Sequence, residues 1–274
     1  MKKLTILTCI LSFPLFSWTN DGDLQPAYRK LKKALGYDWA LIPSGDAKLG
    51  ESIQHVAEFY ILKTEVSNGD YLTFLAFLKD KHPEQYKSAL PDTSVWKDLS
   101  MKYNYTNHYL RHLSFKNYPV VGIKYENALL YCKWLEDNIN SKLEGDKKVV
   151  VKLPSELEWI RAARGSNHSQ IFTWESINLQ DKKGNPLANY RRETRKIEPA
   201  YDGIITIGVK TFDKNQFGVY QMIGNVAEML DERSRVKGGS WNSPAQSLQV
   251  DKSENIDSPS NAVGFRPILV MVSN

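Results

Sequence analysis

The chain of 274 residues has few of the features by which many protein classes are recognised. It holds only two cysteines, Cys9 and Cys132, which excludes a disulfide framework and a cysteine-rich zinc site. Its formal net charge is +5, and removing Lys2 and Lys3 with a leader would lower it to about +3. A charge this small gives no indication of a nucleic-acid partner.

The chain also lacks an apolar run long enough to span a bilayer, which takes about 20 residues. The run from Leu4 to Phe16 has 13 residues and contains Pro14. Because it follows Lys2 and Lys3 and precedes a polar stretch, we expect residues 1–19 to be a cleaved signal peptide rather than a core helix or an anchor. The protein would then be periplasmic, exposed at the cell surface or secreted. Lipidation at Cys9 is disfavoured, because only five apolar residues precede this cysteine.

Familiar catalytic motifs are missing as well. Neither Ser240 nor Ser243 lies in a Gly-x-Ser-x-Gly elbow, and there is no glycine-rich phosphate loop. His108 and His112 have the i, i+4 spacing of helical zinc ligands, but the residues between them lack the glutamate of a metalloprotease. We therefore expect an incidental histidine pair.

Two capping boxes predict helix starts. Ser67 with Asp70 begins a helix that should end before Pro83, and Ser155 with Glu158 begins a helix that should end at Gly165. A further helix should bury Cys132 on its apolar face. Strands are expected at 40–45, 59–62, 118–123 and 149–153, and a short amphipathic helix or linker at 20–38. Residues 82–118 show no sustained period and predict a long irregular insertion.

Several sequence motifs occur in one fixed order. They are TEVSN at 64–68, PVVGI at 119–123, LPSELEW at 153–159, GVYQMIGNVAE at 218–228, and KGGSW at 237–241 followed by GFR at 264–266. Together they resemble the formylglycine-generating enzyme family, also called the sulfatase-modifying factor domain. LPDTSVW at 90–96 and GNVAEM at 224–229 are most similar to the branch that includes gliding-motility lipoproteins of Bacteroidetes.

The resemblance covers nearly all of the mature chain and implies its fold. It predicts a single α+β domain at residues 39–272, a variant of the C-type lectin fold with little regular secondary structure. In catalytic members of the family, two cysteines bind one copper ion, which activates oxygen for the conversion of a substrate cysteine to formylglycine. The matching positions here are Ser243 and Leu248. Monovalent copper prefers soft thiolate ligands, so the resemblance implies a chain without this oxidase activity and without copper.

The resemblance also implies two structural calcium sites, built from the oxygen ligands that this hard cation prefers. The matching first set is the side chains of Asn189 and Asp202 with the carbonyls of Tyr190 and Ile204. The matching second set is the side chains of Gln221 and Glu228 with the carbonyls of Gly224 and Val226. Gln221 stands where Asn or Asp is usual, which should weaken the second site. The alternative for both sets is that these residues only close turns.

These observations predict a non-catalytic binding or scaffold protein of a cell-surface, gliding or secretion assembly, with an unknown protein partner. Within the insertion, Trp96 is expected to be a buried anchor, whereas Tyr103, Tyr105 and Tyr109 are expected to be presented to the partner. Two alternatives stay open. The chain could be an enzyme of altered chemistry in the family cleft. It could also be a carbohydrate-binding module, an alternative that only fold analogy supports.

Overall fold

The computed structural model describes residues 39–99, 104–143, 147–167, 170–174, 178–192 and 205–273. The expected signal peptide at 1–19 and the segment at 20–38 lie outside these ranges. No helix within the described ranges is long and apolar enough to cross a membrane.

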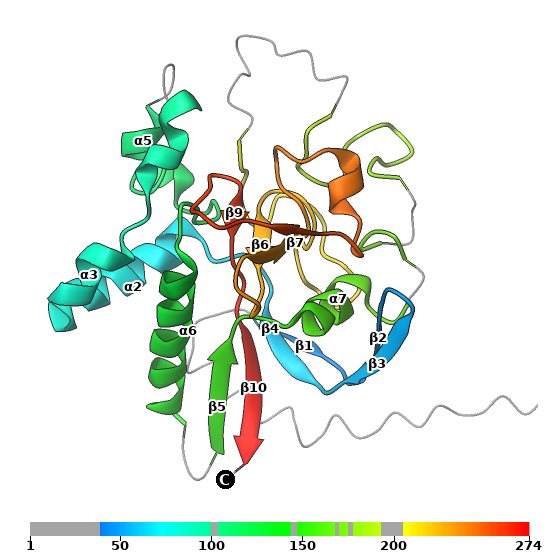
Figure 1. Cartoon of the computed structure of the whole chain (residues 1–274), viewed down its shortest axis with the longest axis horizontal. Coiled ribbons are helices and arrows are strands. Elements are labelled where there is room, and N and C mark those ends of the chain that lie inside the picture. The colour runs from blue at the N-terminus through cyan, green and yellow to red at the C-terminus, as the bar shows by residue number, and fades with distance from the viewer. Residues whose placement is uncertain are drawn as a thin grey trace, which may run out of the picture.

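One antiparallel sheet joins the two ends of the domain (Figure 1). Its strand order is β1 (Trp39–Ile42), β4 (Phe59–Leu62), β10 (Ile268–Ser273) and β5 (Lys147–Lys152). Ile268 of β10 lies opposite Ile61 of β4 on one side and Lys152 of β5 on the other. The last strand of the chain thus lies between its early and middle strands, and the domain closes only when both ends are present.

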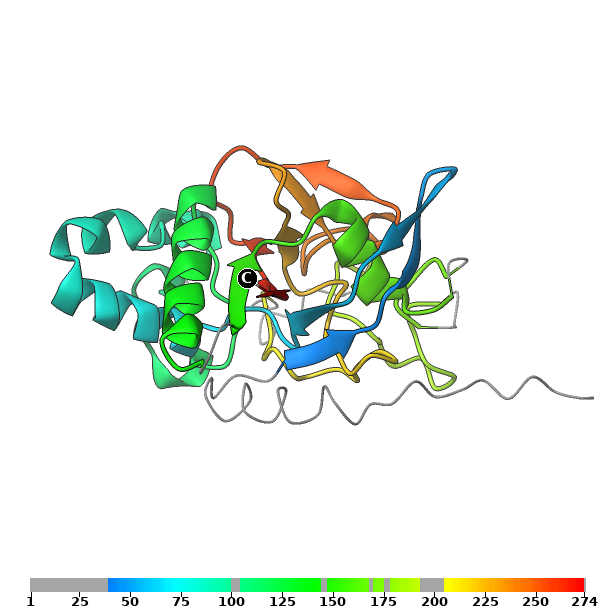
Figure 2. The same ribbon diagram turned by 90° about the horizontal axis from the view of Figure 1, so that it is seen from below.

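Both faces of this sheet are covered. Successive residues of a strand point to opposite faces, and all four residues of β4 are buried. Tyr60 and Leu62 belong to a core cluster shared with helices α2 (Asn68–Lys81) and α6 (Tyr125–Asn140), whereas Phe59 and Ile61 belong to a cluster shared with α7 (Glu156–Arg164). The sheet therefore lies between helices α2 and α6 on one side and helix α7 on the other (Figures 1 and 2).

The capping boxes begin the predicted helices. Ser67 accepts a hydrogen bond from the Asp70 amide while Asp70 accepts from the Ser67 amide, and Ser155 pairs with Glu158 in the same way. Helix α2 ends at Lys81, and α7 ends at Arg164 with Gly165 as its cap at φ = 69°. Both helix predictions are confirmed.

The remaining strands are short. A second sheet has the order β8 (Ser253–Asn255), β7 (Arg235–Lys237), β6 (Ala227–Met229) and β9 (Val263–Gly264), in which β6 and β9 run parallel. A separate hairpin consists of β2 (Gly45–Leu49) and β3 (Ser52–Val56). Long turn-rich connections carry the rest of this half of the chain, together with the short 3-10 helix η4 (Ala245–Leu248).

Two sequence predictions about the insertion and its exit were wrong. Residues 83–115 contain α3 (Pro83–Ala89), η1 (Thr93–Leu99), α5 (Tyr105–His108) and η2 (Leu113–Phe115), each too short to give a sustained period. The strand expected at 118–123 is reduced to one bridge, between Ser67 and Pro119. Its backbone changes partner within three residues, from the carbonyl of Val66 to that of Ser260, and Gly122 adopts φ = 73°.

The domain mixes helices and strands in one fold, as the sequence predicted.

Candidate functional site

A group of charged side chains is fully buried between β6 and the segment that joins β9 to β10. Arg266 donates from Nε and Nη2 to Glu228 Oε1, at 2.9 and 2.6 Å, and Trp159 donates its indole N–H to Glu228 Oε2 at 2.8 Å. The Arg266 guanidinium also reaches the Leu62 and Tyr220 carbonyls, at 3.1 and 2.9 Å. Both oxygens of Glu228 are therefore held by donors of the chain itself.

A second buried carboxylate, Glu65, faces the same guanidinium. Its Oε2 lies 3.8 Å from Arg266 Nη2 and has no hydrogen-bond partner among the described residues, while Oε1 accepts from the Asn225 and Gln221 amides at 2.9 and 3.3 Å. Burial raises the pKa of Glu65 to about 7, and the attraction of Arg266 only partly offsets this. With two carboxylates and one guanidinium, the group has a formal charge of −1, which a proton or a bound cation would neutralise.

The loop beside Glu65 has an unusual backbone. Gln221 and Asn225 both adopt left-handed conformations, with φ of 48° and 62°, which non-glycine residues seldom do. Gln221 Oε1 accepts from the Thr211 and Phe212 amides at 3.2 and 3.4 Å. Asn225 Oδ1 accepts from the Ile207 amide at 2.8 Å. Their side chains thus tie the 205–212 segment to the buried carboxylates.

The predicted first calcium set is only partly within the described residues. Asn189 is buried and donates to the Ile205 carbonyl at 2.9 Å, and Tyr190 is buried next to it. Asp202 and Ile204 lie outside the described residues. Asn189 therefore borders the segment that would complete the set, and the site stays a prediction.

The predicted second calcium set lies in the buried charged group. Gln221, Gly224 and Val226 belong to the loop that enters β6, Glu228 lies within β6, and all four residues are buried. The side-chain oxygens proposed as ligands already accept hydrogen bonds from the chain, whereas the unpartnered oxygen belongs to Glu65. Sequence reasoning missed Glu65, although an acidic residue just after a wholly apolar strand could have indicated it.

Ser243 and Leu248 lie in a closed environment. Ser243 Oγ accepts from the Ser240 amide at 2.9 Å and lies 3.0 Å from the Ser240 hydroxyl. The Leu248 side chain is fully buried in the core cluster of α7. A hydrogen-bonded hydroxyl beside a packed isobutyl group offers no soft ligand for monovalent copper.

Cys132 is the one free cysteine among the described residues and is buried in α6. Burial raises the pKa of its thiol well above the ordinary range. Cys132 belongs to the core cluster of α2 and α6, whereas Leu248 belongs to the cluster on the α7 side. This confirms the expected buried position of Cys132.

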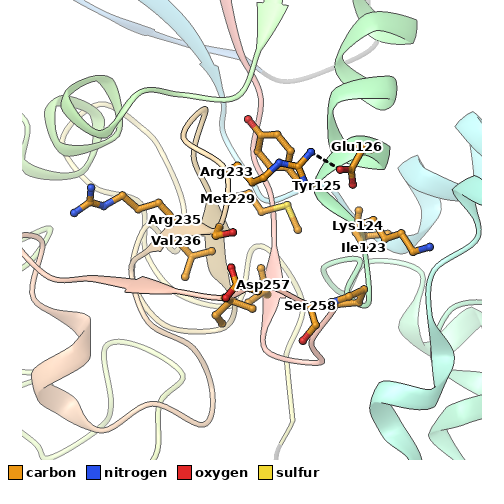
Figure 3. A pocket seen from close by; sticks show the side chains of 14 residues that line it. Ile123, Lys124, Tyr125, Glu126, Met229, Arg233, Arg235, Val236, Asp257 and Ser258 are labelled. Carbon is orange, nitrogen blue, oxygen red and sulfur yellow. Dashed lines mark hydrogen bonds and ion pairs between the residues drawn. The ribbon is translucent and has the colours of Figure 1, made fainter.

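The hollows on the described surface include the following two cavities. A cavity of about 510 Å³ is lined by Tyr190 and Ala245, close in sequence to Ser243, together with Phe172, Leu179 and Asp181. Another, of about 230 Å³, lies between the start of α6 and the turn that joins β6 to β7. Figure 3 shows Arg233 beside Tyr125 and paired with Glu126 at one end of this second cavity and Asp257 toward the other.

The aromatic residues of the insertion are packed rather than presented. Tyr105 and Tyr109 are 6% and 2% exposed and contact Trp96, with ring centroids 5.5 and 4.5 Å from the Trp96 ring. The Tyr109 hydroxyl donates to the Pro119 carbonyl at 2.7 Å. The expectation that Tyr105 and Tyr109 form a binding surface is therefore wrong, because the short helices turn these rings inward. Tyr103 lies outside the described residues, and the predicted burial of Trp96 is confirmed.

Comparisons with known proteins identify the family to which the chain is similar. Residues 27–270 match the family described as "Sulfatase-modifying factor enzyme 1-like domain". The chain is 26% identical over 164 residues to the inactive C-alpha-formylglycine-generating enzyme 2 of Bos taurus, a match that covers 54% of this chain and 49% of that protein. It is 28% identical over 120 residues to the formylglycine-generating enzyme of Mus musculus, covering 42% and 27%. The matches thus span about half the length of these relatives or less.

Solved structures share the fold. CarF superposes with a TM-score of 0.58 at 17% identity, over 85% of this chain and 98% of that chain. PvdO from Pseudomonas aeruginosa superposes with a TM-score of 0.57 at 17% identity, over 84% and 93%. At this level of identity the likeness concerns the fold alone.

Proposed function

The chain belongs to the sulfatase-modifying factor enzyme 1-like domain family, and from that premise we propose that it is a non-catalytic member. In this proposal it is exported and acts as a binding or scaffold component of a cell-surface, gliding or secretion assembly. The non-catalytic part is supported by the resemblance described above, which matches Ser243 and Leu248 to the positions of the copper-binding cysteines. A relative named as an inactive formylglycine-generating enzyme is compatible with it.

Copper does not fit the residues present. The hydroxyl of Ser243 is engaged with Ser240, Leu248 supplies only a buried hydrocarbon, and Cys132 is enclosed in another core cluster. With Cys9 removed in the signal peptide, Cys132 would be the single thiol, and the pair of thiolates that copper requires could not form.

Calcium fits these residues better than copper does, and in this proposal it is a structural ion. Asn189 would contribute to the first site with Asp202 and the carbonyls of Tyr190 and Ile204. At the second site the unpartnered Oε2 of Glu65 and the net negative charge of its group suit a hard cation. The ion would stabilise the turn-rich half of the domain.

A binding role for the surface near Ser243 has separate support. The cavity of about 510 Å³ beside Ala245 and Tyr190 is open and its lining is more polar than apolar, so Asp181 would contact polar groups of a ligand next to the aromatic side chains of Phe172 and Tyr190. An enzyme of altered chemistry would use the same cavity, and this remains the alternative function.

The test measures copper binding and turnover together. The purified chain and its Cys132→Ala variant are titrated with monovalent copper against a chromophoric chelator, and both are incubated with a cysteine-containing peptide. We expect that the Cys132→Ala variant binds no stoichiometric copper. We also expect that neither protein converts the peptide to an aldehyde product. A formylglycine-generating enzyme serves as the positive control. Copper bound by Cys132→Ala with peptide turnover would refute the non-catalytic proposal.

A further inference from the structure

Strand β5 is an edge strand whose outer side is covered by side chains of α6. The Asn140 side-chain amide donates to the Val149 carbonyl and accepts from the Val149 amide, both at 2.9 Å. The Val151 amide donates to Glu136 Oε2 at 3.0 Å. Three outward backbone groups at this edge, the N–H and C=O of Val149 and the N–H of Val151, are thus already hydrogen-bonded.

Strand β2 is protected in a similar way by two arginines of α7. Arg164 Nη1 donates to the Lys48 carbonyl at 3.0 Å. Arg161 Nη2 donates to the Pro43 carbonyl at 3.1 Å, just before the strand begins. Side chains from the neighbouring helix therefore cover the outer side of the hairpin at β2 also.

Strand β3, on the other side of the same hairpin, has no such cover. Gly50 and Glu51 form a two-residue turn with Gly50 at φ = 58°, so Leu49 and Ser52 are the first hydrogen-bonded pair. Pairs alternate along an antiparallel ladder, and Ile53 and His55 therefore point their N–H and C=O groups away from β2. None of these four groups makes a hydrogen bond to another described residue.

The exposure and composition of β3 are those of an open edge. Four of its five residues are exposed, and the Ile53 side chain is 60% exposed. The sequence Ser-Ile-Gln-His-Val contains no lysine, glutamate or proline, the residues that usually prevent pairing at an edge. In Figure 2 the hairpin extends from the body of the molecule, which leaves this edge accessible.

We propose that β3 is a self-association edge that pairs with β3 of a second copy of this chain. The two strands run antiparallel about a two-fold axis at Gln54, so that Ile53 of each copy lies opposite His55 of the other. This register makes four main-chain hydrogen bonds, two at each Ile53 and His55 pair. The two hairpins then form one four-stranded sheet.

The composition of β3 favours a second copy of this chain as its binding partner. An isologous contact requires a self-complementary surface, and a strand without fixed charges can face itself without like-charge repulsion. A contact through one strand of five residues is short compared with stable interfaces, which bury roughly 1,000 Å² or more, so we expect a weak, concentration-dependent dimer. Such an edge contributes most when an assembly raises the local concentration of the chain. Self-association through β3 is independent of whether the chain has oxidase activity.

The first experiment measures association of the purified full chain by sedimentation equilibrium between about 5 and 500 µM. We expect a monomer that becomes a dimer in the upper part of this range. Ile53→Pro removes an outward N–H that β2 does not use, and it should weaken association at least about tenfold. Ile53→Thr is the matched control, because it shortens the same side chain but keeps the N–H, and it should still associate. Thermal melting of both variants checks that the hairpin folds.

The second experiment locates the contact by amide hydrogen exchange at low and high protein concentration. The Ile53 and His55 amides should become protected as concentration rises, while the Gln54 amide, already paired with β2, should not change. A chain that stays monomeric at about 500 µM would overturn the proposal. So would a dimer that persists in Ile53→Pro, or one that leaves the Ile53 and His55 amides unprotected.

Discussion

Glu228 and Arg266 form an ion pair in which both side chains are fully buried, with Nη2 and Oε1 2.6 Å apart. The guanidinium also donates to the Leu62 and Tyr220 carbonyls, so one side chain connects β4, the loop before β6 and the entry to β10. Loss of either partner leaves the other as an uncompensated buried charge.

The first prediction follows from this pair. Arg266→Met should lower the free energy of unfolding by about 3–5 kcal/mol, because Glu228 and Glu65 would both be left buried without a counter-charge. Arg233→Met is the matched control: Arg233 pairs with Glu126 at the surface, where such pairs contribute about 1 kcal/mol or less. Urea unfolding measures both. Equal losses in the two variants would contradict the assignment of Arg266 as a core residue.

The second prediction concerns the pH dependence of stability, which is measured in excess chelator. The pKa of Glu65 rises from 4.5 to about 7 in the folded chain, so the folded state binds the proton more tightly than the unfolded state. The contribution of Glu65 to stability is therefore complete below about pH 4.5, decreases as the pH rises to about 7, and is constant above that.

Glu65→Gln tests this directly. The variant cannot ionise at position 65, so its melting temperature should fall less than that of the parent between about pH 5 and 7. Glu126→Gln, a change of the same kind at an exposed carboxylate, controls for the altered net charge. A parent curve that is parallel to the Glu65→Gln curve over this range would contradict the raised pKa.

The helices that the sequence predicts best are those whose signals are local. Ser67 and Asp70 lie three residues apart, as do Ser155 and Glu158, and each pair specifies a helix start through its own hydrogen bonds. Proline and glycine then mark where the two helices end. The buried face of α6, which includes Cys132, follows from periodicity in the same way.

The parts that sequence reasoning missed depend on distant contacts. Glu65 and Arg266 are far apart in the chain and meet only because β4 and β10 pair. The orientation of Tyr105 and Tyr109 depends on Trp96 and on the Thr206 hydroxyl, contacts between separate segments that no local pattern specifies. Topology, rather than propensity, therefore decides which residues form the candidate site.

The third prediction concerns calcium. An ion that binds only the folded chain stabilises it by about 2.7 kcal/mol at a hundredfold excess over Kd, so calcium should raise the melting temperature and a chelator should reverse the rise. Asp202→Ala should remove most of the gain if the first site dominates. Asp213→Ala, an acidic residue outside both predicted sets, is the control. Identical melting curves with calcium and with chelator would contradict both sites.

The last prediction tests whether the insertion is core or surface. The Tyr109 hydroxyl is buried, lies 2.6 Å from the Thr206 hydroxyl and donates to the Pro119 carbonyl at 2.7 Å. Tyr109→Phe leaves that carbonyl and the Thr206 hydroxyl without this partner, and should lower the free energy of unfolding by about 1–3 kcal/mol.

Tyr86 is partly buried and its hydroxyl makes no hydrogen bond within the described part of the chain, so Tyr86→Phe should change stability by less than about 0.5 kcal/mol. Both variants lose the same hydroxyl oxygen. The difference between their free energies of unfolding in urea therefore measures the contribution of the buried hydrogen bonds of Tyr109. If Tyr109 instead served as a presented contact, Tyr109→Phe would be as stable as Tyr86→Phe. A clear difference between them would mean that the aromatic residues at 96, 105 and 109 hold the insertion against the domain, because a surface ring tolerates loss of its hydroxyl.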